Sequence, residues 1–319
     1  MKDPWGERFP ACVPWPWRTL LQARKVWRQS LTRWQERAAA RRPLDPLLED
    51  GEPMEPLGER VFASNPRGVI TKCARWHEED LQRPDIKAVV DQLQALRAEL
   101  TAKGLRFTNT AGNFLAREYD PRYESGKLWE ACWTIAHSRV APAHAVLDIG
   151  GASTIFSFYL ASLGCRVAVV DNDWANCGLS LNARHVANRM GWRLDAVDRD
   201  ASRPLPFPDD AFDRVFSVCV LEHLPPRVRQ RLMREIGRVL APGGVAGFTM
   251  DYDHSRPVLV TDKGLRFAYR GKLERDVIRP SGLRLHGPAD WSDACPPETF
   301  MGALFLEKPL GHAVEAIRS

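Results

Sequence analysis

Short runs of β-branched and other apolar residues alternate with helical stretches from Ala143 onward, and this alternation constrains the fold more than any other feature. Such an order is typical of parallel strands joined by crossover helices. The expected strands are 145–149, 166–171, 193–197, 213–218 and 245–250. The expected helices are 153–163, 174–190 and 227–240, the last followed by a Pro-Gly-Gly turn at 242–244. We expect 283–285 and 300–306 to be antiparallel strands that close the sheet.

The segment before this pattern has a different character. Ten of the 45 lysines and arginines fall within residues 1–42 against three acids, so the rest of the chain is slightly acidic. Residues 16–42 read as a basic amphipathic helix with tryptophans on its apolar stripe. Such a helix either packs on its own protein, which we favour, or lies on an anionic membrane surface. We expect residues 1–60 to form this basic tail and a linker rich in proline and glycine.

Residues 61–142 are expected to form a helical cap. A helix is predicted over 85–103, where apolar residues keep helical spacing and Gly104 ends the run. A second helix is predicted over 124–139, leading directly into the first strand.

Several classes of protein are excluded by the sequence. There is no run of about 18 apolar residues that could span a membrane, and residues 1–42 lack the pattern of a secretion signal. We therefore expect a cytoplasmic protein. The seven cysteines are scattered without a Cys-x-x-Cys pair, which argues against a disulfide framework and against a zinc knuckle.

A glycine turn follows the first expected strand, with Asp148 before it and Gly150 and Gly151 within it. At the carboxyl end of a parallel strand, such a turn lets backbone N–H groups approach a ligand. Asp171 ends the second expected strand and is placed to accept hydrogen bonds from ribose hydroxyls. The full Gly-x-Gly-x-x-Gly spacing of dinucleotide sites is missing, so a nucleoside without a pyrophosphate fits better.

The chain resembles the class I S-adenosylmethionine-dependent methyltransferases, in the branch around the ubiquinone and menaquinone C-methylases. The segment 146–154 is similar to the Asp-x-Gly-x-Gly-x-Gly loop of that family, and 169–171 to its ribose-binding strand end. Further similar segments are the adenine loop at 200–213, the fourth-strand end at 217–224, and the helix and turn at 236–244. The resemblance spans 143–308 and implies that 143–319 is a methyltransferase domain. It also implies an α/β fold: a Rossmann-like, mostly parallel sheet with an antiparallel closing strand, flanked by helices.

The resemblance implies that the cofactor is S-adenosylmethionine and assigns residues to its parts. Near the methionine moiety it places Asp148, Gly150 and Gly151; at the ribose, Asp171; at the adenine, Asp200 and Ala201; and at the fourth-strand end, Ser217. Asp198 competes with Asp200, because the strand register decides which of the two faces the ligand. Ala152 and Thr154 stand where the family usually has glycines.

Two elements are expected on the acceptor side. His223 follows the fourth strand, and we hold two roles open for it: a base that takes a proton from the acceptor, or a scaffold residue. Residues 251–254, of sequence Asp-Tyr-Asp-His, follow the fifth strand, where we expect polar contacts to the acceptor and no metal ion.

The sequence is compatible with three functions. The first is methyl transfer to O, C or N of a small or lipid-like organic acceptor. The second is a degenerate domain that binds the cofactor or a partner without turnover, which Ala152 and Thr154 suggest. The third, methylation of nucleic acid, is disfavoured because the fourth-strand end reads Ser-Val-Cys-Val, not Asn-Pro-Pro-Tyr, and the body is slightly acidic. We therefore expect no nucleic-acid partner, and any peripheral membrane contact to run through residues 16–42.

Overall fold

The computed structural model describes residues 73–75, 78–107, 121–172, 178–251, 260–261, 264–265, 273–287, 289–290 and 301–310. All of them belong to one compact unit within 54–319. The tail helix expected at 16–42 and the acceptor contacts expected at 252–254 lie outside the described residues. No helix in the described ranges is both long enough and apolar enough to cross a membrane.

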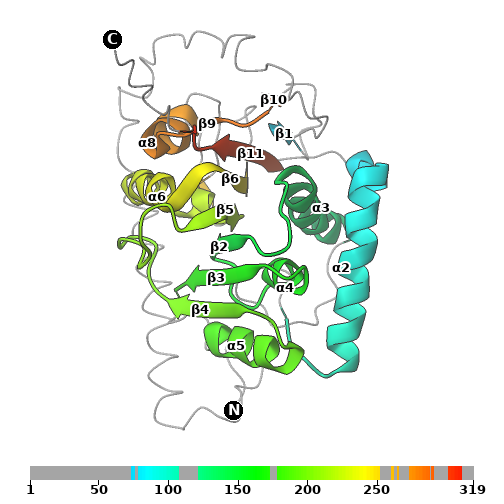
Figure 1. Ribbon diagram of the computed structural model, residues 1–319. Coiled ribbons are helices and arrows are strands. Elements are labelled where there is room, and N and C mark those ends of the chain that lie inside the picture. Colours follow the sequence, from blue (N-terminus) through cyan, green and yellow to red (C-terminus); the bar gives the residue numbers. More distant parts are fainter. Residues whose placement is uncertain are drawn as a thin grey trace, which may run out of the picture. The chain divides into compact units, whose positions relative to one another are not determined.

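Nine strands of the described chain form one sheet, in the order β10-β1-β11-β6-β5-β2-β3-β4, with β9 also paired to β11 (Figure 1). Their bounds are β1 (Cys73–Arg75), β2 (Ala145–Ile149), β3 (Arg166–Asp171), β4 (Leu194–Asp198), β5 (Phe212–Val218), β6 (Leu240–Asp251), β9 (Arg284–Leu285), β10 (Ala289–Asp290) and β11 (Met301–Glu307). A separate pair is made by β7 (Val260–Thr261) and β8 (Gly264–Leu265).

The strands β6, β5, β2, β3 and β4 are parallel neighbours, and β11 runs antiparallel to β6. This confirms the predicted Rossmann-like sheet, mostly parallel with an antiparallel closing strand. The carboxyl ends of β2, β3, β4 and β5 consequently lie at one edge, where the predicted site residues follow the strands. Because helices cover both faces of such a sheet, its strands are mostly apolar: every residue of β2 after Ala145 is buried, and Asp148 is the only polar one among them.

The helices match the predicted segments closely. They are η3 (Glu78–Gln82), α2 (Pro84–Ala102), α3 (Pro121–His137), α4 (Ile155–Ser162), α5 (Leu179–Met190), η5 (Leu221–His223), α6 (Pro226–Val239), the π-helical η6 (Glu274–Ile278) and α8 (Arg279–Ser281). In the helix α2, the predicted apolar face is buried, with Ile86, Leu93 and Leu100 wholly inaccessible.

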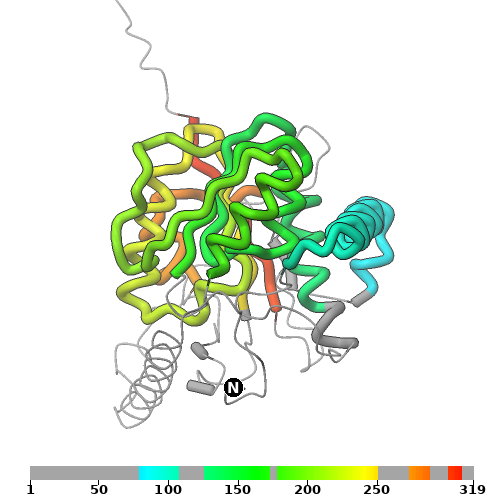
Figure 2. The backbone as a smooth tube through the Cα atoms, turned by 90° about the horizontal axis from the view of Figure 1, so that it is seen from below, coloured from blue at the N-terminus to red at the C-terminus, as the bar shows by residue number. Residues whose placement is uncertain are grey.

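The expected cap helices pack on the sheet domain. The helix α3 contacts β6 and β11, while α2 contacts α3 and α4 from outside. Figure 2 shows α2, in cyan, at the periphery of the green segments that it covers. Stacked rings tie α3 together inside this layer: the Trp129 and Trp133 ring centroids are 5.1 Å apart, and His137 lies 4.3 Å beyond Trp133.

Two differences from the predicted strands have clear causes. The turn expected at 242–244 lies within a longer β6, where pairing skips from Phe212 opposite Leu240 to Arg214 opposite Val245. A β-bulge accommodates the extra residues, and Gly243 takes a positive φ of 75° there.

The second difference is β1, which lies in the segment expected to be helical. It pairs antiparallel with β11, Ala74 opposite Ala303, on the same edge where β9 places Leu285 opposite Leu306. β1, which precedes the sheet domain in the sequence, and β9, which lies near its end, thus both pair with the edge of β11 that faces away from β6. A three-residue strand is too short for its side-chain alternation to be recognised in a sequence.

Candidate cofactor and acceptor site

The turn after β2 needs glycine at two consecutive positions. Gly150 has a φ of 83°, and a Cβ there would lie 2.4 Å from Cγ2 of Val220. A Cβ on Gly151 would lie 1.9 Å from Oδ2 of Asp148. Side chains are therefore excluded from this turn, and its backbone can closely approach both the end of β5 and any ligand above it.

Asp148 lies under this turn with its carboxyl group buried. Its Oδ2 accepts a 2.5 Å hydrogen bond from Ser157 Oγ, whereas its buried Oδ1 has no hydrogen-bond partner in the described part of the chain. Burial raises the pKa of Asp148 to about 7, and the negative charge of Asp171 adds to this effect, while the Ser157 hydrogen bond opposes it. The site therefore holds a buried acid with one oxygen available to a polar or cationic group.

Asp171, at the end of β3, reaches the same turn. Its Oδ2 accepts a hydrogen bond from the Ala152 N–H at 3.2 Å. The side chain is nearly buried, at 9% exposure. The structure therefore brings the two predicted carboxylates together at the glycine turn, one beneath it and one beside it.

Ala152 and Thr154, which replace the glycines of the family pattern, are integrated into the loop. Ala152 is fully buried. Thr154 caps α4: its Oγ1 accepts from the Ser157 N–H at 3.2 Å and donates to the Gly151 carbonyl at 2.9 Å. A side chain that satisfies the first turn of a helix contributes about 1 kcal/mol to its stability. The Thr154 side chain therefore has a structural role at the start of α4.

The predicted adenine contacts follow β4. Asp198 stands opposite Asp171 in the strand register and is exposed. Asp200 is also exposed, and its Oδ1 accepts from the Ser202 N–H at 2.7 Å, which fixes a turn that includes Ala201. Both acids lie at the edge of the sheet where the carboxyl ends of the parallel strands meet, so each remains a candidate contact to the adenine.

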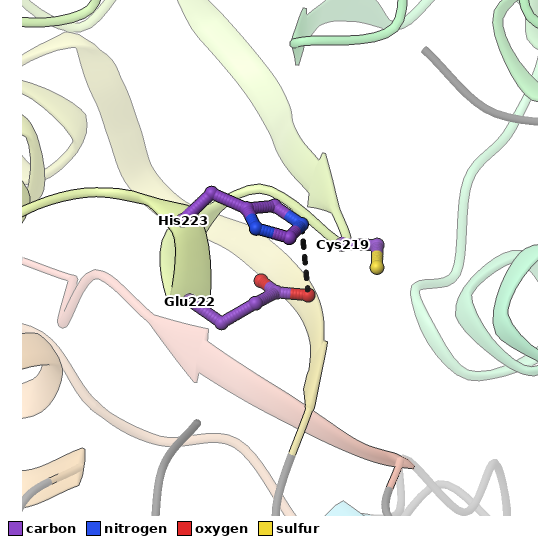
Figure 3. A group of neighbouring side chains, drawn as sticks. All are labelled: Cys219, Glu222 and His223. Atoms are coloured by element: carbon purple, nitrogen blue, oxygen red, sulfur yellow. Dashed lines mark ion pairs between the residues drawn. The ribbon is translucent and has the colours of Figure 1, made fainter. Parts of the chain in front are cut away.

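The end of β5 forms the other side of the site. Ser217 is buried, and its Oγ has no hydrogen-bond partner within the described ranges. Cys219 has a φ of 57°, and its N–H donates to both the carbonyl and the Oγ1 of Thr249, each at 3.1 Å. In the following η5 turn, Glu222 is buried while His223 is half exposed, and His223 Nε2 lies 3.9 Å from Glu222 Oε1 (Figure 3).

A lysine of α3, which the sequence analysis did not single out, also belongs to this region. Lys127 Nζ lies 2.6 Å from Glu130 Oε2, with side-chain exposures of only 9% and 0%. Burial alone would lower the pKa of Lys127, but the adjacent Glu130 and a hydrogen bond with Cys219 hold that pKa well above its usual value. The only sequence signal was a Lys-Glu pair at i,i+3 in an aromatic helix, a spacing that also occurs on solvated faces.

These residues fit S-adenosylmethionine as a ligand. Two buried polar atoms of the site, Asp148 Oδ1 and Ser217 Oγ, have no hydrogen-bond partner among the residues that the structure describes. The glycine turn offers its backbone at close range, and acids stand at the ends of β3 and β4. Together they supply the acceptors and backbone groups that a nucleoside carrying an amino acid requires.

Comparisons with known proteins agree with this geometry. Residues 147–248 match a family model described as a methyltransferase domain. An uncharacterized protein of Haemophilus influenzae is 31% identical over 134 residues, which are 42% of this chain and 53% of that protein. The 27-O-demethylrifamycin SV methyltransferase of Amycolatopsis mediterranei is 35% identical over 100 residues, which are 27% of this chain and 35% of that protein. The chain thus spans about half, or less, of the length of these curated relatives.

A solved structure shares the fold. The crystal structure of the cyclase SpnF superposes with a TM-score of 0.50 over 75% of this chain and 98% of that one, at 18% sequence identity. At this identity the likeness concerns the arrangement of helices and strands alone. The match to the family model and the fold lead to one conclusion: residues 147–248 are similar to methyltransferase domains and lie on a Rossmann-like sheet.

Proposed function

We propose that this chain transfers the methyl group of S-adenosylmethionine to O, C or N of a small or lipid-like organic acceptor. The observation that carries the proposal is the pair of carboxylates, Asp148 and Asp171, at the glycine turn inside the segment that matches the methyltransferase model. When bound, the cofactor supplies an electrophilic methyl group on a sulfonium centre.

The roles of the cofactor-side residues follow from their chemistry. The carboxylate of Asp171 accepts hydrogen bonds from ribose hydroxyls, as its place at the end of β3 suggests. Asp148, together with Gly150 and Gly151, holds the methionine part. The remaining contacts are Asp200 and Ala201 at the adenine, and Ser217 at the end of β5.

His223 has the properties of a base for a protonated acceptor. It is half exposed, so an acceptor can reach it, and the buried Glu222 beside it stabilises the protonated imidazole. Proton removal is needed only for acceptors that arrive protonated. For the others, the chain's contribution is to hold the acceptor in line with the methyl group and to exclude water.

A small organic acceptor is supported by one relative. The name of the Amycolatopsis mediterranei protein states that it methylates 27-O-demethylrifamycin SV, a small molecule. The fold itself does not decide the reaction, because the SpnF structure shares it and is called a cyclase. Activity must therefore be tested separately from cofactor binding.

Two measurements test the proposal together. Calorimetric titration should show binding of S-adenosylmethionine, and Asp171→Ala should weaken it by about 1 to 3 kcal/mol. Asp195→Ala is the matched control, because Asp195 is an exposed aspartate on the neighbouring β4. Transfer of a tritiated methyl group to cell extract should then label a small organic product.

The outcomes separate the alternatives. Binding without any labelled product would favour the degenerate domain without turnover. Absence of binding by the wild type, or an unchanged affinity in Asp171→Ala, would remove the cofactor assignment or its ribose contact.

A further inference from the structure

Three side chains with metal-binding atoms converge just beyond β5. Within the described part of the chain, Cys219, Glu222 and His223 each bring one ligand atom within 4.8 Å of the other two. The thiol comes from the residue after the strand end, and the carboxylate and imidazole come from η5 (Figure 3). We propose that these three residues bind a divalent transition-metal ion of the zinc class. The metal site would share His223 with the proposed acceptor side, but its occupation requires no methyl transfer.

The spacing of the atoms is close to what a zinc ion requires. Bonds of about 2.0 to 2.3 Å in a tetrahedral arrangement separate neighbouring ligand atoms by about 3.3 to 3.8 Å. Nε2 of His223 and Oε1 of Glu222 are already 3.9 Å apart. All three ligand atoms lie within 4.8 Å of one another, so they must approach each other by about 1 Å or less to bind one ion.

The donor set selects the class of ion. A thiolate is a poor ligand for magnesium or calcium, whereas sulfur, imidazole and carboxylate together suit zinc. Cys219 binds as the thiolate, and its proton passes to solvent. The thiolate and the Glu222 carboxylate then balance the two positive charges of the ion.

The nearby lysine does not oppose this balance. Lys127, on α3, lies beside Cys219. The charge of Lys127 is compensated by Glu130, 2.6 Å away, on the same helix.

Two buried charged side chains hold η5, the turn that carries Glu222 and His223, in place. Arg229 Nη1 donates to the Leu221 carbonyl at 3.0 Å, and Arg229 Nη2 lies 3.1 Å from Asp276 Oδ2. Both charged side chains are completely buried. A ligand set supported in this way is pre-organised, because the supporting residues limit the positions of the turn.

One side of the proposed site is open. His223 is 49% exposed, whereas Glu222 is 1% exposed, so an ion would reach the three ligands from the side of the imidazole. Three protein ligands and one open position are typical of zinc sites that exchange a ligand. A bound ion also occupies the nitrogen of His223, so zinc should inhibit methylation of protonated acceptors. This last consequence, unlike binding itself, rests on the proposed function.

The direct test is a cobalt(II) titration of the full chain without a histidine tag, followed by visible and near-ultraviolet absorption. We expect a sulfur-to-cobalt charge-transfer band that zinc removes by displacement. Cys219→Ser should abolish this band, and His223→Ala should weaken zinc affinity by about 100-fold or more. The matched controls are Cys165→Ser, a cysteine whose thiol donates to the Ala141 carbonyl, and His185→Ala on the exposed surface of α5.

The proposal is overturned if the wild type shows no charge-transfer band, or if Cys219→Ser retains it. Circular dichroism of each variant confirms that a lost band does not reflect unfolding. Cofactor titration of the same samples separates the two proposals. Cofactor binding without a cobalt band would contradict the metal site and leave the methyl-transfer proposal unaffected. A cobalt band without cofactor binding would contradict the methyl-transfer proposal and leave the metal site unaffected.

Discussion

Replacing Asp148 by asparagine should make the cofactor-free protein more stable at pH 8. The carboxyl group is buried, and its pKa in the folded chain is about 7, against an ordinary value of 3.8. One pKa unit corresponds to about 1.4 kcal/mol, so holding this group ionised in the folded chain costs about 4 kcal/mol. Asparagine avoids that cost and still accepts the hydrogen bond from Ser157.

The sign of the pH dependence follows from the raised pKa. The folded chain binds more protons at this group than the unfolded chain does between pH 3.8 and about 7. Its contribution to stability is therefore fully present below pH 3.8 and is lost as the pH rises through about 7. From pH 5 to pH 8, the wild type should lose about 2 to 3 kcal/mol more stability than Asp148→Asn.

Urea unfolding at pH 5 and pH 8, followed by tryptophan fluorescence, measures this difference. Asp195→Asn is the control, because its side chain is 74% exposed. Equal pH dependence in the wild type and Asp148→Asn would refute the reasoning from burial. The same variant should bind S-adenosylmethionine more weakly at pH 8, because the cofactor carries positive charge and the variant lacks the carboxylate.

Four further results are expected. His223→Ala should lower kcat by about 100-fold to 10,000-fold with a protonated acceptor and leave cofactor affinity nearly unchanged; near-full turnover would make His223 a scaffold residue. Gly150→Ala should abolish cofactor binding in calorimetry, because the added Cβ would lie 2.4 Å from Val220 and the φ is positive. Lys127→Met should cost about 3 to 5 kcal/mol in urea unfolding, because it leaves the Glu130 charge buried alone, and adding Glu130→Gln should restore most of the loss; equal instability of single and double variants would contradict the pair. If the tail packs on its own protein, deleting residues 1–42 should unfold or destabilise the rest of the chain, and the intact chain should sediment only weakly with anionic vesicles; strong, salt-sensitive sedimentation would contradict this packing.

The sequence predicted the parts of the fold that depend on local patterns. The strands at 145–149 and 166–171 and the helix beginning near Asp85 follow from side-chain spacing and helix ends, which are properties of neighbouring residues. The grouping of Asp148 and Asp171 was also predictable, because parallel strands place their carboxyl ends at one edge of a sheet.

The parts that were not predicted depend on contacts between distant residues. Lys127 and Cys219 meet only because α3 packs on the sheet, against β6 and β11, and neither neighbourhood in the sequence indicates the other. Likewise, the bulge in β6 depends on its pairing with β5, although the glycine that permits it was recognised as a turn residue. The pairing of β1 with β11 also depends on residues that are far apart in the sequence.

The pairing of β1 with β11 also determines when this edge of the sheet can form during synthesis of the chain. Ala74 emerges from the ribosome early, but its partner Ala303 is made after almost all of the sheet. The parallel strands can assemble beforehand, so this edge should be the last part of the sheet to form, with the long loop closure that slows folding. Until then β6 presents unpaired backbone groups, the kind of edge that recruits other chains. A chain halted shortly before residue 301 should therefore aggregate, whereas one that includes β11 can close its own edge.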